Sequence, residues 1–280
     1  MHKSPIIDLA GFQIDLSIVF MLLVTCTIVF VLALLATRNL SVENPGKLQN
    51  FLEWAVEFVQ GLISSTMDLK KGKPFLSLGL ALIMFLFVGN LLGLPLGIVT
   101  DYHDAEHAKV FGKEIVSVTK ELDKLHADAE SGTVSTDSHE EIEVGVAWWK
   151  SPTADPAVAM GLAVMIFLMT HIVGMTRNTK NYFKHYFEPY PFFFPINLIE
   201  QVSKLLTHGM RLFGNIFAGE VLISVILKLA ALGVGGWIAS VLGLIVWQGF
   251  SIFIGTIQAF IFVMLTMVYF SQMLETHDEH

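Results

Sequence analysis

The most constraining feature of this sequence is a series of long apolar stretches that carry very few charged residues. Because the hydrocarbon core of a bilayer is about 30 Å thick, a helix that crosses it needs roughly 20 mostly apolar residues. Five stretches meet this requirement, at residues 16–36, 75–98, 157–175, 196–232 and 237–273. The last two exceed one crossing, so we expect them to be strongly tilted, kinked or partly interfacial. The sequence therefore predicts one all-α integral membrane domain, 1–280, with five membrane helices, of which the last two form a long, tilted hairpin.

The charge distribution supports this assignment. Only 15% of the residues are charged, against about 25% in soluble domains. The formal charge of −8 comes mainly from residues 101–150, whose 12 acidic and 5 basic residues account for −7. We predict that 99–155 is an acidic extracytoplasmic loop, and that its insertion is flexible and solvated rather than a collector of cations. The acidic balance argues against nucleic acid as a partner, and the lone Cys26 allows no internal disulfide.

Basic residues near the helix ends set the predicted orientation, because cytoplasmic loops carry an excess of lysine and arginine. The loops after the first and third stretches are the basic ones, with Arg38, Lys47, Lys70, Lys71 and Lys73 in one and Arg177, Lys180 and Lys184 in the other. We therefore expect a multi-pass protein of the cell membrane with its N-terminus outside and its C-terminus in the cytoplasm. The first apolar run is too long for a signal peptide, so we expect it to be retained.

Residues 47–68 have a different pattern, in which apolar positions recur at helical spacing between polar ones. This segment is too polar to span a membrane, and the pattern predicts an amphipathic helix on the cytoplasmic side. Its apolar face can lie on the membrane surface or pack against a partner, and the two arrangements are compatible.

The fourth apolar stretch carries the largest number of ionisable residues, namely Glu200, Lys204, His208, Arg211, Glu220 and Lys228. Such groups are costly inside a membrane and are functional candidates. At about 100° per residue, Lys204 and Asn215 share a stripe with Arg211. Glu220 lies on the opposite face, about 13 Å along the axis. Since arginine stays protonated and a glutamate can titrate, we infer an ion path that a fixed cation interrupts.

Two interpretations stay open for the neighbours of Arg211. Glu200 and Lys204 have the favourable i,i+4 order for a local ion pair, or Lys204 and His208 serve the inner end of the path. In the fifth stretch, Ser251, Gln258 and Tyr269 share a stripe. Simple helix–helix hydrogen bonding accounts for the serine and the tyrosine, whereas an amide in the middle of a membrane needs specific partners.

Three blocks of this sequence resemble a known family. Residues 211–220, RLFGNIFAGE, look like the signature of subunit a of the bacterial F-type ATP synthase. Residues 256–262, TIQAFIF, resemble the second block of that family, and residues 148–155, WWKSPTAD, resemble the segment before its third helix in Bacillus-like bacteria. The resemblance covers the chain except for roughly 101–143. It implies a non-catalytic, ion-translocating subunit of the membrane sector that needs no cofactor.

The resemblance also implies roles for individual residues and for partners. Arg211 matches the arginine that faces the ring of c subunits and separates two aqueous half-channels, and Gln258 matches the glutamine opposite it. Asn215 and Glu220 match half-channel positions, with Glu220 on the outer path, and Asp155 matches an acid near the outer mouth. The implied partners are the c-subunit ring, the b-subunit stalk, membrane lipid and a coupling ion, with H⁺ favoured over Na⁺.

The chain departs from the family pattern at one position. Seven residues before Gln258, where some members place a histidine thought to pair with the glutamate, this sequence has Ser251. Either Ser251 or His171 of the third helix can take over the relay near Glu220. For His171, ordinary helix packing is an equally good interpretation.

Two other classes of function fit the sequence less well. His103, Glu106 and His107 match the H-x-x-E-H pattern of some zinc peptidases, but they lie in an acidic segment with little apolar material to enclose a metal, so adventitious binding is the better interpretation. A self-contained secondary transporter is disfavoured because the sequence has no inverted repeat.

Overall fold

The computed structural model describes residues 4–9, 11–93, 99–102, 109–110, 113–130, 144–177, 179, 182, 187 and 190–274. The chain divides into two compact units. One contains Met1–Thr25 and Leu91–Pro152, and the other contains Cys26–Asn90 and Thr153–His280.

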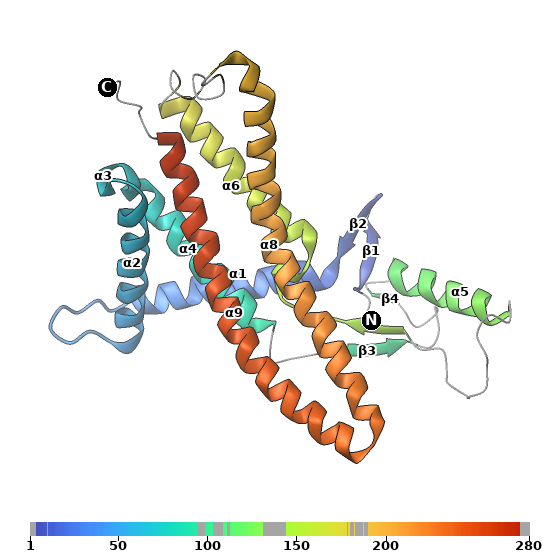
Figure 1. The fold of residues 1–280 in the computed structure, drawn as a ribbon. Coiled ribbons are helices and arrows are strands. Elements are labelled where there is room, and N and C mark those ends of the chain that lie inside the picture. The colour runs from blue at the N-terminus through green and yellow to red at the C-terminus, as the bar shows by residue number, and fades with distance from the viewer. Residues whose placement is uncertain are drawn as a thin grey trace. The chain divides into compact units, whose positions relative to one another are not determined.

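Within the described residues, five helices are long and apolar enough to cross a membrane, which confirms the predicted all-α membrane fold class. They are α1 (Leu16–Thr37), α4 (Leu76–Leu92, preceded by α3, Leu69–Gly72, and the 3-10 turn η1, Lys73–Phe75), α6 (Pro156–Arg177), α8 (Phe194–Leu229) and α9 (Val234–Leu274). The 3-10 turn η4 (Ala230–Leu232) and Gly233 join α8 to α9, which run antiparallel (Figure 1). Gly233 has φ +92°, a conformation that residues with a side chain rarely adopt.

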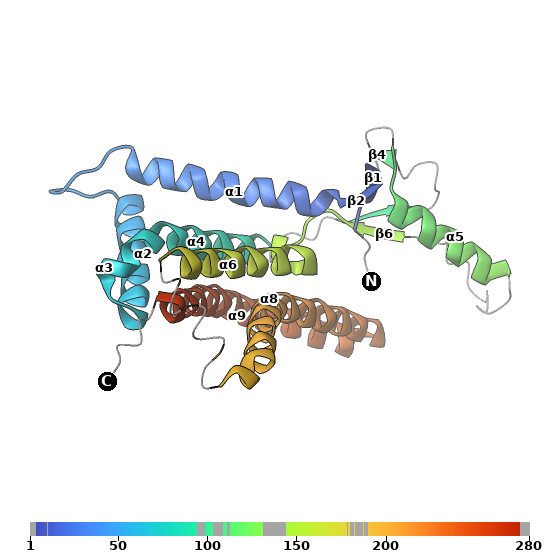
Figure 2. The ribbon, with the colours of Figure 1, turned by 90° about the horizontal axis from the view of Figure 1, so that it is seen from above.

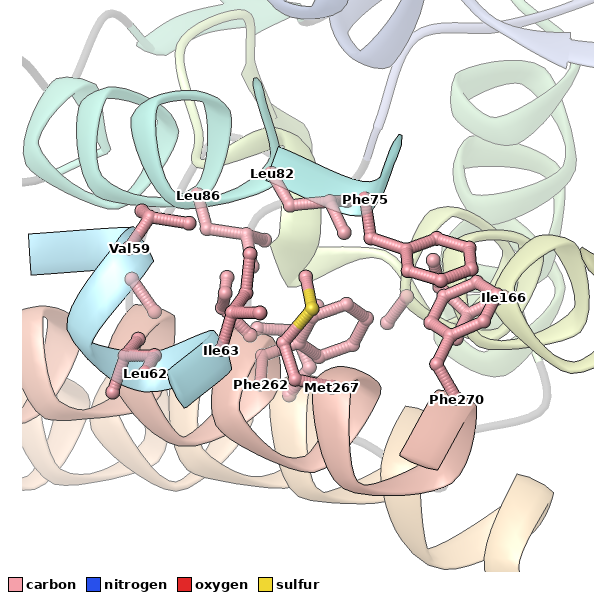
Figure 3. Close-up of a cluster of buried hydrophobic side chains, with 14 of the residues drawn as sticks. Val59, Leu62, Ile63, Phe75, Leu82, Leu86, Ile166, Phe262, Met267 and Phe270 are labelled. Atoms are coloured by element: carbon pink, nitrogen blue, oxygen red, sulfur yellow. The ribbon is translucent and has the colours of Figure 1, made fainter. Parts of the chain in front are cut away.

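The core of the larger unit forms where α2 (Lys47–Thr66), α4, α6 and α9 meet (Figure 3). Its buried side chains include Val59, Leu62, Ile63, Phe75, Leu82, Leu86, Ile166, Phe262, Met267 and Phe270. Gly79 permits this close packing, because a Cβ there would lie 2.7 Å from Met267 Cε and 2.9 Å from Val59 Cγ1. Figure 2 shows α4 and α6 on one side of the α8–α9 pair, with α2 across their ends.

The structure gives the amphipathic helix α2 a packing partner within its own chain. Ala55, Val59 and Ile63 are buried, and α2 packs against α9. Its first turns remain apolar and exposed, with Phe51 42% and Trp54 59% accessible. The helix therefore covers the core with one part of its apolar face and leaves the other part for lipid or a partner.

Two contacts hold the far end of α9, and a third joins the same group of residues to α6. The Ser271 hydroxyl donates to the Thr66 carbonyl of α2 at 2.6 Å. Phe270 stacks on Phe75 with ring centroids 4.2 Å apart, and the Arg177 guanidinium lies 5.9 Å from the centre of the Phe75 ring. We call these five residues the end cluster. They join α2, η1, α6 and α9.

The smaller unit contains strands that the sequence analysis did not predict. β1 (Ile6–Leu9) pairs antiparallel with β2 (Phe12–Asp15) through a turn at Gly11, whose φ is +87°. β3 (Val99–Tyr102) pairs with β6 (Val144–Ala147), and β4 (Lys109–Val110) pairs with β5 (Lys113–Glu114). These short strands lie outside the five membrane helices.

The described part of the acidic segment has a core of its own. α5 (Val116–Glu130) and β6 bury Ile115, Val118, Leu122, Val144 and Val146, with Tyr102 and Trp148 packed against them. Alternate residues of β6 face this core, as expected for a half-buried strand. The prediction of a flexible, solvated insertion is therefore wrong for these residues. The sequence signal was missed because the charged residues between the apolar ones dominated the composition.

A partly buried ion pair ties the N-terminal hairpin to the segment before α6. Lys150 Nζ lies 2.8 Å from Asp15 Oδ2 and donates to Ser4 Oγ at 2.6 Å. The other oxygen of Asp15 accepts from the backbone N–H and the hydroxyl of Ser17, at 2.9 and 2.7 Å, at the start of α1. Burial raises the pKa of Asp15, but the hydrogen bonds from Lys150 and Ser17 outweigh it, so the pKa lies below its ordinary 3.8.

This lowered pKa predicts an acid-sensitive unit. A carboxyl whose pKa is depressed by folding contributes stability above its ordinary pKa, and the contribution is lost as the pH falls through the lowered value. We expect Asp15→Asn to weaken the unit by about 2 kcal/mol at neutral pH, as for a hydrogen bond to a charged group. Hydrogen exchange of the β1–β2 amides in the intact complex measures this change. The difference between the variant and the wild type should shrink as the pH falls below 3.8 and close below the lowered pKa of Asp15. A constant difference down to acid pH would contradict the assignment.

Candidate functional site

Contacts between α8 and α9 fix how the two helices face each other. Lys204 Nζ lies 3.3 Å from Gln272 Oε1, and His208 Nε2 lies 3.4 Å from Thr266 Oγ1. Farther along, a Cβ on Gly219 would lie 3.0 Å from the Trp247 ring. The α9 segment between Trp247 and Thr266 therefore faces the α8 segment between Gly219 and His208. The first of these segments holds Ser251 and Gln258, and the second holds Arg211 and Asn215.

Arg211 is exposed on α8, in an open part of its surface. Gly214, one turn farther on, would meet nothing within 4 Å if it carried a Cβ, and Thr207 and Ala218 are also exposed. The facing part of α9 is open as well, at Gly249 and Thr256. Among the residues that the structure describes, no carboxylate forms an ion pair with Arg211. A cation at membrane depth needs water or an acidic group as a partner. This open face leaves room for an acidic group from another molecule.

Glu220 lies nine residues beyond Arg211 on α8, and its side chain lies outside the described part of the structure. Its neighbour Gly219 contacts Trp247. Ser251 is one helical turn from Trp247, so Ser251 lies near the level of Glu220. Asn215 is half-buried between Arg211 and Glu220.

His171 lies elsewhere. It belongs to α6 and lines a cavity together with Gln201, Lys204 and His208 of α8. His208 is twelve residues before Glu220, or about 18 Å at 1.5 Å per residue. The Nδ1 atom of His171 lies 2.8 Å from the Phe167 carbonyl oxygen, and the His171 ring packs on Phe167. This placement agrees with the packing interpretation, and we do not propose His171 as a partner of Glu220.

Lys204 and Glu200 form the local ion pair, with a distance of 2.8 Å between Nζ and Oε1. His208 is 2% exposed and stacks on Phe262, with centroids 3.9 Å apart. Tyr269 lies edge-on to the same histidine at 5.5 Å. Tyr269 therefore belongs to the group of residues around His208, at a distance from Ser251 along α9.

A polar residue that the sequence analysis did not single out holds α9 in place near Gln258. The Asn90 amide of α4 donates to the Gly255 carbonyl of α9 at 3.0 Å and accepts from the Thr153 hydroxyl at 3.0 Å. Asn90 is 8% exposed, Thr153 is fully buried and Gln258 is 6% exposed. Gly255 allows the approach, since a Cβ there would lie 3.2 Å from Asn90 Cβ. The sequence did contain a signal for Asn90. It is a single amide in an otherwise apolar stretch, and an amide inside a membrane requires hydrogen-bond partners.

The WWKSPTAD block, residues 148–155, makes structural bonds within each unit. The Trp148 indole donates to Thr100 Oγ1 at 2.7 Å, and the Trp149 indole donates to the Leu92 carbonyl at 2.6 Å. Asp155 accepts from the Ala157 N–H at 2.7 Å and so caps α6, with Pro156 at the first helical position. Capping of α6 is therefore a structural reason for an acid at position 155, and it is compatible with a role at a channel mouth.

His103, Glu106 and His107 lie outside the described residues. Among the residues that the structure does describe, no group of three His, Cys, Asp or Glu side chains is placed to hold a metal ion.

Comparison with known proteins identifies the family. The family model described as "ATP synthase A chain" matches residues 18–271. The chain is 43% identical over 278 residues to ATP synthase subunit a of Anoxybacillus flavithermus, with 99% of each chain covered. It is 42% identical over 286 residues to ATP synthase subunit a of Bacillus subtilis, again with 99% of each chain covered. This chain belongs to the ATP synthase subunit a family.

Family membership extends across the acidic segment as well. The subunit a of Staphylococcus carnosus is 43% identical over 288 residues and covers 100% of this chain. The alignment therefore runs through residues 101–143, which the three motif blocks do not cover. The folded unit around Val146 is within the part of the chain that aligns with these family members.

Proposed function

We propose that this chain is the stationary proton-channel subunit of an F-type ATP synthase, which couples proton translocation to rotation of a c-subunit ring. The observation that carries the proposal is the exposed Arg211 in an open, small-residue surface of α8 and α9, in a chain of the subunit a family. Small residues let helices of different subunits approach closely in a membrane. The positions of Gly214, Ala218 and Gly249 are suited to such an approach.

In this proposal Arg211 acts as a fixed charge. A ring carboxylate that arrives opposite the guanidinium is stabilised as the anion, because an opposite charge within a few ångströms favours ionisation, and so it releases its proton. Arginine keeps its own proton at all physiological pH values. It therefore also blocks direct passage of protons between the two half-channels.

The surrounding polar residues take the remaining roles. Glu220, Asn215 and Ser251 serve the outer half-channel, and Gln258 faces the segment that holds Arg211. Asp155 lies toward the outer mouth if the N-terminus is outside, as the basic loops favour. The partners in this assembly are the c-ring, the b-subunit stalk and lipid, and the chain itself catalyses no covalent reaction.

Reconstitution tests this function. In vesicles that contain the complete synthase, we expect an imposed proton gradient alone to drive ATP synthesis and a sodium gradient alone to fail. The same chain reconstituted by itself should transport no solute. Uptake of a solute by the isolated chain would favour a self-contained secondary transporter, and sodium-driven synthesis would overturn the assignment of the coupling ion.

A further inference from the structure

A buried amide of α4 lies against the middle of α9. Asn90 is 8% exposed. Its amide nitrogen donates to the Gly255 carbonyl, and its amide oxygen accepts from the Thr153 hydroxyl, both at 3.0 Å. Thr153 is fully buried, in the 3-10 turn η2 (Pro152–Ala154) that precedes α6. One side chain therefore connects α4, α9 and the segment that leads into α6.

The bond to Gly255 restrains α9 without opening it. In an α-helix a carbonyl accepts from the N–H four residues farther on, and its oxygen has a second lone pair for another donor. The carbonyl points along the helix axis, so a side chain that donates to it fixes both the height of the helix and its rotation. Contacts between apolar side chains restrain sliding and rotation less strictly, because they have no preferred direction.

The glycine at position 255 is what allows this bond to form. A Cβ there would lie 3.2 Å from Asn90 Cβ and 3.7 Å from Asn90 Nδ2, so α4 and α9 would have to separate by a few tenths of an ångström. The donor–acceptor distance of 3.0 Å is already near the upper part of the usual range for such a bond. The amide on α4 and the glycine on α9 therefore depend on each other.

The bond lies within the polar stripe of α9. At about 100° per residue, Ser251 and Gln258 both lie within about 60° of Gly255. Gln258 is 6% exposed and lies about 4.5 Å farther along the axis. The hydrogen bonds at Thr266 and Ser271 are eleven or more residues beyond Gly255. Of these restraints on α9, the bond from Asn90 is the nearest to Gln258.

We propose that Asn90 is a positioning residue of the proton channel, whose bonds to Gly255 and Thr153 hold Gln258 at the correct height and rotation opposite the α8 segment that contains Arg211. This role rests on the proposed function. Asn90 takes up no proton, and its effect passes through Gln258. Displacing a group by 1 Å from a site of charge transfer can lower the rate by about 10²-fold, so shifts of a few tenths of an ångström are large enough to measure.

The sharpest test alters the bonds of Asn90 and leaves Asn90 itself in place. Thr153→Val keeps the shape of the side chain but cannot donate. Gly255→Ala adds the obstructing Cβ, and it improves helix propensity, so a loss cannot come from a weaker helix. We expect each to lower ATP-driven proton pumping per assembled synthase by about three- to tenfold, the range that corresponds to one neutral hydrogen bond. Thr153→Ser keeps the donor and should pump at close to the wild-type rate.

Thr25 of α1 provides a matched control for the valine substitution. It is fully buried like Thr153, but its hydroxyl has no hydrogen-bond partner among the described residues. Thr25→Val should therefore assemble and pump like the wild type. Pumping is measured in inverted membrane vesicles and divided by the amount of assembled synthase in the same membranes, which separates a slower channel from a smaller number of channels.

A double-variant comparison tests whether Asn90 acts through Gln258. Asn90→Leu removes both bonds and should lower pumping about tenfold in the wild-type background. In a Gln258→Asn background, where the amide is already displaced, the same change should lower the rate by a smaller factor. Equal factors in the two backgrounds would show that Asn90 does not act through Gln258.

The outcomes separate the two proposals. If Asn90→Leu and Thr153→Val both pump at the wild-type rate per assembled complex, the positioning role is wrong and the channel function stands. The same conclusion follows if Thr153→Ser loses as much as Thr153→Val, because the hydroxyl is then not what matters. If the wild-type complex pumps no protons, both proposals fail.

Discussion

Replacing Arg211 with alanine should abolish ATP-driven proton pumping by the complete synthase. The guanidinium is exposed on α8 with no carboxylate of the described residues paired to it. In the proposed function its loss therefore leaves a ring carboxylate without its counter-charge. Removing a preorganised charge from a site of low dielectric costs about 10²–10³ in rate. Pumping in inverted vesicles should therefore fall to background. ATP hydrolysis by the detached soluble sector should be unaffected.

A second cation of the same helix provides the control for this experiment. Lys228 is exposed near the far end of α8, where a lysine can extend to the membrane surface. Lys228→Ala should pump at close to the wild-type rate. Glu220→Gln should give an intermediate decrease. Normal pumping by Arg211→Ala would refute the assignment of this arginine to the ring-facing position.

Replacing Gly209 with leucine should prevent α6 and α8 from packing. A Cβ at Gly209 would lie 2.3 Å from Met160 Sδ and 3.2 Å from both the Cα of Met160 and the Cβ of Ala163. The thioether can move, but the backbone of α6 cannot move without separating the helices. Overpacking of this kind costs about 1–3 kcal/mol and sometimes more. We expect a lower melting temperature of the detergent-solubilised complex and less assembled synthase in membranes.

Gly161 of α6 is a matched control for this change. A Cβ there would meet nothing within 4 Å, and a glycine-to-leucine substitution improves helix propensity equally at both positions. Gly161→Leu should therefore leave assembly and the melting temperature at or above the wild-type values. Equal losses in the two variants would show that the close contact at Met160 is not the cause.

The membrane helices could be predicted because the bilayer imposes a length and a polarity that single stretches of sequence satisfy. The same reasoning placed Arg211 and Lys204 on one stripe, since positions on a helix follow from residue spacing alone. Asn90 was not recognised, because its partners Gly255 and Thr153 are distant in sequence. Only the packing of α4 against α9 brings them together.

The prediction that the acidic segment is flexible and solvated failed for a different reason. Its core depends on pairing between β3 and β6, which lie more than 40 residues apart, and on a single helix, α5, whose charged face dominates its composition. For His171 the sequence left helix packing and the relay near Glu220 equally open. Its spacing within α6 gave no information about which end of α8 it would contact.

The end cluster has a mechanical consequence for the proposed function. A ring that turns against α8 and α9 pushes these helices sideways, and an α9 held only by the bilayer would tilt under that load. The stacked rings of Phe75 and Phe270 and the bond from Ser271 to Thr66 connect its end to α2, which crosses the ends of the neighbouring helices. The reaction force therefore spreads over several helices, and the channel face keeps its position while the ring moves past it.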